Sequence, residues 1–242
     1  MRRTVLLALG AAGVAALAGC GQEATRPNDN LVNGKQLFVS KCGSCHTLAR
    51  AGTKGTVGPN LDEAFRQSLG DGMGRSVVRG VVEHQILYPY TLKNQSTGTQ
   101  MPAKLVKGED ASDVAAYVAL VSARAGKDSG LLASAVKQAG AGKPIAEQNG
   151  VLQIDADPTG QLAYVSNKAT GQPGPVTFKM QNKASVPHDL VVQGPGVQGK
   201  TPIQQGGGVG QFKATLKAGT YTYFCSVDGH RAAGMQGKIT VK

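Results

Sequence analysis

The periodicity of the apolar residues changes along this chain of 242 residues, and that change constrains the fold most strongly. Between residues 73 and 86, valines recur at i, i+1, i+4 and i+5, which is the spacing of one face of an α-helix. After residue 150, apolar and polar residues alternate, as they do in half-buried β-strands. We therefore expect a multidomain protein, with an all-α domain followed by an all-β sandwich.

Further segments follow one period or the other. Helices are expected at residues 31–41, 73–86 and 111–121, with a weaker one at 131–139. Strands are expected at residues 151–154, 176–180, 220–224 and 237–241, separated by Gly and Pro. The domains are accordingly placed at residues 31–125 and 151–242. Residues 126–150, rich in Ala, Gly, Lys and Gln, are expected to form a flexible linker.

The N-terminal segment predicts export. Its apolar run, residues 4–18, is shorter than the roughly 20 residues that span a bilayer and suits a secretory signal. The run ends in Leu-Ala-Gly-Cys20, which resembles the signal of bacterial lipoproteins, in which the Cys becomes an acylated N-terminus. We expect a signal peptide at 1–19, a lipid anchor on Cys20 and a flexible tether at 20–30. An ordinary cleaved signal with a chance Cys is the alternative.

A short motif in the first domain predicts a specific cofactor. Cys42, Cys45 and His46 form the sequence Cys-x-x-Cys-His, which is the attachment signature of c-type haem. Two thiols one helical turn apart can add to the two vinyl groups, and the adjacent imidazole can ligate the iron from below. Half of a zinc site is the alternative, but the sequence lacks a second close Cys/His pair to complete it.

With this motif, the first domain resembles class I cytochrome c over about 95 residues, through Gly34-Lys35-x-Leu37-Phe38, Gly58-Pro59-Asn60-Leu61 and Met101-Pro102-Ala103. The resemblance implies that the Pro59 carbonyl accepts the other imidazole N–H of His46, and that Met101 is the second axial ligand. Met73 and His84 are the alternatives for that position. Iron with both axial positions filled favours electron transfer over oxygen or peroxide chemistry.

The second domain carries four potential metal ligands in order. Cys225, His230 and Met235 follow the spacing Cys-x4-His-x4-Met, and His188 lies 37 residues before the Cys. One thiolate, two imidazoles and a weak thioether are the ligands of a type 1 (blue) copper site. The alternative is a buried structural thiol with an unrelated surface His.

This domain resembles the cupredoxins, and its ligand loop resembles the rusticyanin-like and auracyanin-like members most. In the family the residue after the first His is often Asn, which ties the two ligand loops together. Asp189 stands there in this chain, and Ser226 is its expected partner. The resemblance also implies docking of redox partners through the exposed edge of His230, which Ala232 and Ala233 would surround.

Two other classes of ligand are not expected. Residues 194–201 match the P-loop pattern, but Pro202 follows at once and no helix period comes after it, so a turn-rich β-loop is expected instead of a nucleotide site. The chain has no Trp and only 5% aromatic residues, which disfavours a nucleic-acid platform.

The cysteines and histidines of the chain are too few to ligate a further, catalytic metal. Cys20, the haem cysteines and Cys225 use all four cysteines, and only His84 is spare among the four histidines. We therefore expect an extracytoplasmic, membrane-anchored electron carrier with one haem c and one type 1 copper, and not an enzyme. It would shuttle single electrons between respiratory or photosynthetic complexes. The formal net charge of +11 favours redox proteins with an acidic docking face. A small oxidoreductase and a copper-storage protein are the alternatives.

Overall fold

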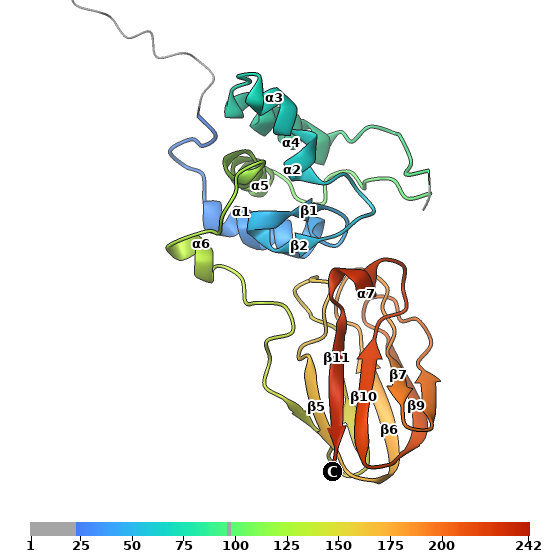
Figure 1. Ribbon diagram of the computed structural model, residues 1–242. Helices are drawn as coiled ribbons and strands as arrows, with labels where there is room; N and C mark the ends of the chain where they lie inside the picture. The colour runs from blue at the N-terminus through green and yellow to red at the C-terminus, as the bar shows by residue number, and fades with distance from the viewer. Residues whose placement is uncertain (1–22, 96–97) are drawn as a thin grey trace, which may run out of the picture.

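The computed structural model describes residues 23–95 and 98–242, and these fold into a helical module followed by a β-sandwich (Figure 1). The predicted fold class is thereby confirmed. The expected signal peptide and Cys20 lie outside the described residues. Within the described ranges, none of the helices combines the length and the apolar character that a membrane crossing requires.

The helical module contains the three helices that the apolar stripes predict, together with several shorter ones. The strongest predictions correspond to α1 with the π-helical turn η1, to α4 and to α5, whereas the weak helix at 131–139 shortens to α6. The bounds are α1 Leu31–Leu37, η1 Phe38–Cys42, η2 Ala49–Ala51, α2 Leu61–Ala64, α3 Arg66–Gly70, α4 Arg75–Leu87, α5 Glu109–Val121 and α6 Leu131–Ser134, with a small hairpin of β1 Thr47–Leu48 and β2 Thr53–Lys54.

Helices α1 and α5 cross in the centre of this module and are joined by polar contacts at one end. The Asn30 side chain caps α1 by accepting a hydrogen bond from the Asn33 backbone N–H at 3.0 Å. The Asp113 carboxylate of α5 accepts from the Asn30 N–H and from the Asn33 side chain, both at 2.8 Å. Phe38 and Tyr117 are buried between the two helices and α4 packs against α5.

The described part of the expected tether is packed on the helical module. Ala24 is buried beside Val78 and Ala119. The Asp29 carboxylate forms a two-pronged ion pair with the guanidinium of Arg79, at 2.5 and 2.7 Å, and both side chains are buried. The structure therefore differs from the predicted flexible tether, because Ala24 packs against apolar side chains and Asp29 pairs with a buried Arg79.

The second module is a sandwich of a six-stranded and a three-stranded sheet. The strand orders are β3-β5-β11-β10-β7-β8 and β4-β6-β9. All four predicted strands are present, as β4, β6, β10 and β11. The bounds are β3 Ile145–Ala146, β4 Val151–Gln153, β5 Lys168–Gly171, β6 Gly174–Gln181, β7 Val191–Gly194, β8 Val197–Lys200, β9 Val209–Leu216, β10 Gly219–Phe224 and β11 Gln236–Val241, with a helical turn α7 at His230–Ala233.

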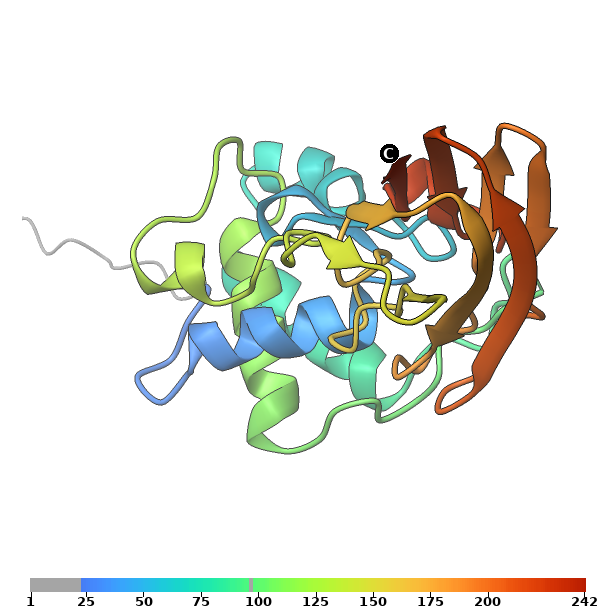
Figure 2. The ribbon, with the colours of Figure 1, turned by 90° about the horizontal axis from the view of Figure 1, so that it is seen from below.

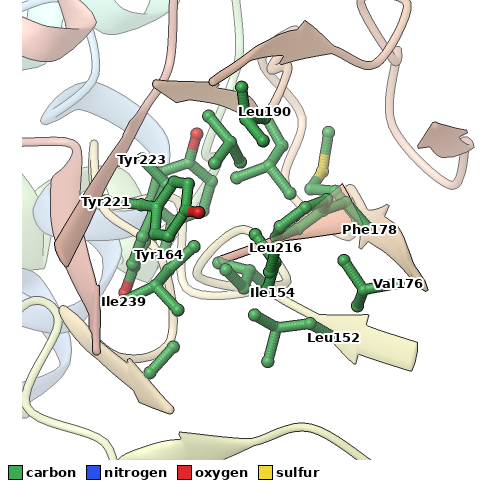
Figure 3. Close-up of a cluster of buried hydrophobic side chains, with 14 of the residues drawn as sticks. Leu152, Ile154, Tyr164, Val176, Phe178, Leu190, Leu216, Tyr221, Tyr223 and Ile239 are labelled. Carbon is green, nitrogen blue, oxygen red and sulfur yellow. The ribbon is translucent and has the colours of Figure 1, made fainter. Parts of the chain in front are cut away.

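The core of the sandwich lies between the two sheets (Figure 3). Alternate residues of β6 point inward, so Val176, Phe178 and Met180 are buried while their neighbours are half-exposed. Tyr221 and Tyr223 of β10 face them from the other sheet. The P-loop-like segment, residues 194–201, forms the turn and the second strand of the hairpin β7–β8, as expected of a turn-rich β-loop.

The linker begins with a carboxylate that is buried in the helical module. The side chain of Asp128, which is only 1% exposed, accepts a hydrogen bond from the Tyr117 hydroxyl at 2.8 Å. Lys35 Nζ lies 3.0 Å and Arg50 Nε 2.9 Å from its two oxygens. Three separate elements, α1, η2 and α5, therefore hold one linker residue.

Figures 1 and 2 show the path of the linker from the helical module to the sandwich, and further contacts fasten it along this path. The Lys35 and Gln36 side chains donate to the carbonyls of Leu132 and Ala135, at 2.7 and 3.0 Å. From Gly140 onward the chain pairs with the sandwich, first through the Asn167 N–H and then as β3 beside β5. Between these contacts, Val136 packs on the core of the helical module and the Gln161 side chain of the sandwich donates to the Lys137 carbonyl at 3.2 Å. The linker is therefore clamped at both ends and is not a flexible tether.

Replacing Asp128 by Asn should loosen this clamp. Removing one partner of a buried charge cluster leaves the others uncompensated, so we expect the free energy of unfolding to fall by about 3 kcal/mol. Urea unfolding of the cofactor-loaded protein measures it. Glu63→Gln is the matched control, because it breaks a carboxylate–Arg66 pair that is exposed to solvent, and it should change stability far less. Equal effects of the two variants would contradict the role of Asp128.

Candidate metal centres

The haem motif lies where the first helix ends. Helix η1 stops at Cys42, and the backbone then turns so that the N–H groups of Cys45 and His46 both donate to the Cys42 carbonyl, at 3.0 and 2.9 Å. The Thr53 hydroxyl donates to the His46 carbonyl at 2.9 Å and accepts from the Leu48 N–H at 3.0 Å. These contacts fix the motif against the β1–β2 hairpin.

The imidazole of His46 is oriented by the loop that follows the hairpin. Its Nδ1 lies 2.9 Å from the Pro59 carbonyl oxygen, and because a carbonyl can only accept, Nδ1 carries the proton. Nε2 therefore keeps its lone pair for a metal. Burial lowers the pKa of His46, which favours the neutral ring, while the Pro59 contact raises it. The partner that the resemblance implied for His46 is thus in place.

Gly58 allows this loop to approach the ring. A Cβ atom at Gly58 would lie 2.4 Å from His46 Cε1, which is far inside van der Waals contact. Any side chain there would displace the imidazole or the loop. In the sequence, Gly58 is recognisable only as part of a family pattern, and that pattern does not reveal this packing contact.

A cavity of about 730 Å³ opens beside the motif and is mostly apolar. Burial raises the pKa of the Cys42 thiol to about 12, with a smaller contribution from Cys45. Two thiols, an available imidazole nitrogen, a thioether and apolar walls match the chemistry of a c-type haem. The cavity is lined by Cys42, Cys45, His46 and Met101 together with apolar residues that include Phe38, Leu61, Phe65, Val82, Ile86, Val114 and Val118.

The alternative axial ligands are placed elsewhere. His84 is exposed on α4, with its ring centroid 5.6 Å from that of Tyr88. Met73 lies just before α4 and is 39% exposed. Among the described residues that line the cavity, Met101 is present and His84 and Met73 are not. The geometry therefore favours Met101 for the second axial position.

The second centre is formed where β10 and β11 end. These strands pair antiparallel with Phe224 opposite Gln236, so the residues just beyond the pair, Cys225 and Met235, also face each other. The Cys225 N–H donates to the Met235 carbonyl at 3.1 Å, and the Met235 N–H donates to the His230 carbonyl at 3.0 Å. The loop between the strands is therefore closed by its own backbone.

Three donor groups converge at this point. His188 Nδ1 and His230 Nδ1 are 3.1 Å apart, and Cys225 Sγ lies 3.9 Å from the first and 3.4 Å from the second. All three residues are buried, and their ligand atoms lie within 4.8 Å of one another. Met235 is fully buried in the same core cluster as Cys225. This donor set suits copper in both oxidation states.

Burial keeps the two imidazoles neutral and the Cys225 thiol protonated. It lowers the pKa of His188 to about 4, with the charge of His230 as a further cause, so the imidazole is neutral at pH 7. It also lowers the pKa of His230. Burial raises the pKa of the Cys225 thiol to about 12, so a metal must displace its proton.

Asp189 ties the two ligand loops together, as its expected pairing with Ser226 requires. Ser226 donates its backbone N–H to one carboxylate oxygen at 2.6 Å and its hydroxyl to the other at 2.5 Å. Tyr164, which the sequence analysis did not single out, supports the same loop: its hydroxyl donates to the Asp189 carbonyl at 2.7 Å. Tyr164 belongs to no recognisable sequence motif, and its role is revealed only by its hydrogen bond to the Asp189 carbonyl.

Copper uptake should release about one proton per chain near neutral pH, because the Cys225 thiol is protonated while both imidazoles are already neutral. Below about pH 5 the release should rise, since His188 gains a proton as the pH falls toward its pKa of about 4. Titrating the haem-loaded, copper-free protein with Cu(II) at constant pH measures the proton count. Cys225→Ser is the control without a thiol, and no release by the native chain at pH 7 would contradict a protonated Cys225.

Comparisons with known proteins divide the chain at the same place. A family model described as cytochrome c matches residues 31–122, and one described as copper binding proteins of the plastocyanin/azurin family matches residues 152–242.

Relatives of both kinds are found. Cytochrome c of Ulva intestinalis is 32% identical over 104 residues, which cover 39% of this chain and 93% of that protein. Rusticyanin of Acidithiobacillus ferrooxidans is 36% identical over 100 residues, or 40% of this chain. The chain spans only about half, 52%, of the length of that rusticyanin. The crystal structure of reduced auracyanin from Roseiflexus castenholzii aligns with 40% of this chain and 99% of its own at 21% identity, with a TM-score of 0.35.

Proposed function

We propose that this chain is a membrane-anchored extracytoplasmic electron carrier. It belongs to the cytochrome c family and continues into a module of the plastocyanin/azurin type. It would pass single electrons between complexes of a respiratory or photosynthetic chain. The observation that carries the proposal is that one chain holds two separate groups of donors, one suited to haem c and one suited to type 1 copper. When bound, each group exchanges one electron.

The residues of the first module would hold the haem as follows. Cys42 and Cys45 would form the two thioether bonds, and His46 would ligate the iron through Nε2, with Pro59 fixing its proton on Nδ1. Met101 would supply the second axial ligand from within the same cavity. If His46 and Met101 both hold the iron, the chain itself would leave no position for a small-molecule substrate, which would suit a carrier better than an enzyme.

The residues of the second module would hold the copper. His188, Cys225 and His230 offer three buried donors, and Met235 would be the weak fourth ligand. Asp189 and Ser226 keep the two ligand loops together, so both oxidation states would meet the same donor positions. A fixed geometry suits a carrier, because little has to rearrange when an electron arrives or leaves.

The charge around the haem cavity supports docking to acidic redox proteins. Lys41 and Lys93 are exposed, and both line the cavity. The chain as a whole has a formal net charge of +11. Opposite charge on a partner would speed the encounter and orient it toward the haem. No nucleic acid or nucleotide is included among the proposed partners.

Replacing Met101 by Ala tests the proposed carrier role. The native iron should bind neither cyanide nor CO, because both axial positions are filled. Met101→Ala should keep the haem, since Cys42 and Cys45 hold it covalently, but should open one position and lower the reduction potential. Absorbance with cyanide and CO, and a redox titration, measure both effects. Met73→Ala is the matched control, and it should behave like the native chain. Ligand binding by the native protein would favour a small oxidoreductase instead.

Replacing Cys20 by Ser tests the membrane anchor. Two or more acyl chains on one Cys hold a protein stably on a bilayer, so the variant should leave the membrane fraction while the native chain stays. Both visible spectra should remain unchanged, because Cys20 is not among the proposed ligands of either centre. Fractionation of the expressing cells after a high-salt wash, with the spectra of each fraction, gives the result. A Cys20→Ser protein that still pellets with membranes would rule out the lipid anchor.

A further inference from the structure

The β-sandwich touches the helical module beside the haem motif. Gly160, in the loop between β4 and β5, is buried against the backbone of Ser40. A Cβ atom at Gly160 would lie only 2.4 Å from the Ser40 carbonyl oxygen. Ser40 belongs to η1 and stands two residues before Cys42. This first contact therefore rests on the turn of helix that leads into the haem-attachment motif.

A second contact joins the copper loop to the rim of the haem cavity. A Cβ atom at Gly229 would lie 3.2 Å from the Thr56 hydroxyl oxygen, so the two residues are neighbours. Gly229 directly precedes His230. Thr56 lines the haem cavity and stands two residues before Gly58, which packs on the His46 ring. In Figure 1, α7, which begins at His230, lies at the end of the sandwich that faces the helical module.

We propose that the loop carrying Cys225 and His230 is docked on the rim of the haem cavity, so that the haem site of the same chain is the redox partner of the copper site. The inference rests on the proposed function and adds the identity of that partner. The clamped linker supports it: Asp128 holds one end on the helical module, and β3 holds the other on the sandwich. Residues that touch at Gly160 and Gly229 thus belong to modules that cannot drift far apart.

A docked pair differs physically from two modules on a flexible tether. A tether supplies only a millimolar-order effective concentration, and each transfer must await an encounter. Here the contact already exists before the electron arrives. The transfer would balance as one electron lost by reduced haem iron and gained by oxidised copper, with no proton moved and no bond made or broken. An external redox protein, or a photoreductant in the laboratory, supplies that electron.

Paired glycine variants test the docking without touching a ligand. Gly160 and Gly196 both have a positive φ, 84° and 74°, so Leu would strain the backbone similarly at either position. At Gly160 the side chain would meet Ser40, whereas at Gly196 a Cβ has nothing within 4 Å. Gly160→Leu should enlarge the radius of gyration of the fully loaded protein in X-ray scattering. It should also weaken the broadening of the Cu(II) electron paramagnetic resonance signal by oxidised haem. Gly196→Leu should leave both unchanged, and identical results for the two variants would overturn the docking.

Kinetics of the native protein provide a test that needs no variant. A light pulse reduces the haem, and the bleaching of the copper absorbance is followed at several protein concentrations and glycerol viscosities. Docking predicts a rate that depends on neither. A rate that is independent of protein concentration but falls with viscosity indicates encounters of tethered modules. A rate proportional to protein concentration indicates independent carriers. Either result would overturn the docking.

Failure of the docking can be separated from failure of the proposed function. Both visible spectra and one-electron titrations of the loaded chain report the two centres regardless of how the modules are arranged. Normal spectra with viscosity-dependent transfer would remove the docking alone. Loss of either centre from the native chain would remove the carrier function with it.

Discussion

The buried carboxylate of Asp128 determines how the two halves of this chain are arranged. It receives the Tyr117 hydroxyl, the Lys35 ammonium and the Arg50 guanidinium within a space that water scarcely reaches. Each donor comes from a different element of the helical module, so the first linker residues cannot move independently of it. Because the sandwich begins to pair with the chain at Gly140, the clamp also limits where the second module can lie.

Both metal centres are prepared by the same means. In each, backbone groups of a short loop take part: the Pro59 carbonyl accepts from His46 Nδ1, and backbone hydrogen bonds among Cys225, His230 and Met235 close the copper ligand loop. Burial supports this arrangement, because it disfavours the imidazolium and leaves the lone pair available.

The sequence was most informative where function depends on local spacing. Cys42, Cys45 and His46 lie within five consecutive residues, and Cys225, His230 and Met235 lie within eleven. Their spacing alone therefore indicates the cofactors, which the family matches confirm. Periodicity likewise predicts α4, α5 and the strands β6, β10 and β11. The assignment of individual ligands stays a prediction, although the structure brings the copper set together and places Met101 in the haem cavity.

The sequence predicts the structure less well in segments that lack an apolar period. The linker and residues 23–30, which precede α1, are short and lack an apolar period, which is typical of flexible chain, yet both are packed. The reason lies in partners far away in the sequence: Asp128 binds Lys35, and Asp29 binds Arg79. A single sequence does not reveal such pairs, because an Asp in a polar stretch looks the same whether its cation is solvent-exposed or buried. The contacts of Tyr164 with Asp189 and of Gly58 with His46 are hidden in the sequence for the same reason.

The antiparallel pairing of β10 with β11 has a consequence for assembly of the copper site. Side chains alternate between the two faces of a strand, so a slip of one residue would turn Met235 away from Cys225 and carry the whole apolar face of β11 out of the core. The ligand set can be complete only when the sheet is aligned correctly. A metal that binds there consequently selects the correctly aligned sheet over its shifted alternatives, and acts as a check on the folding of the module.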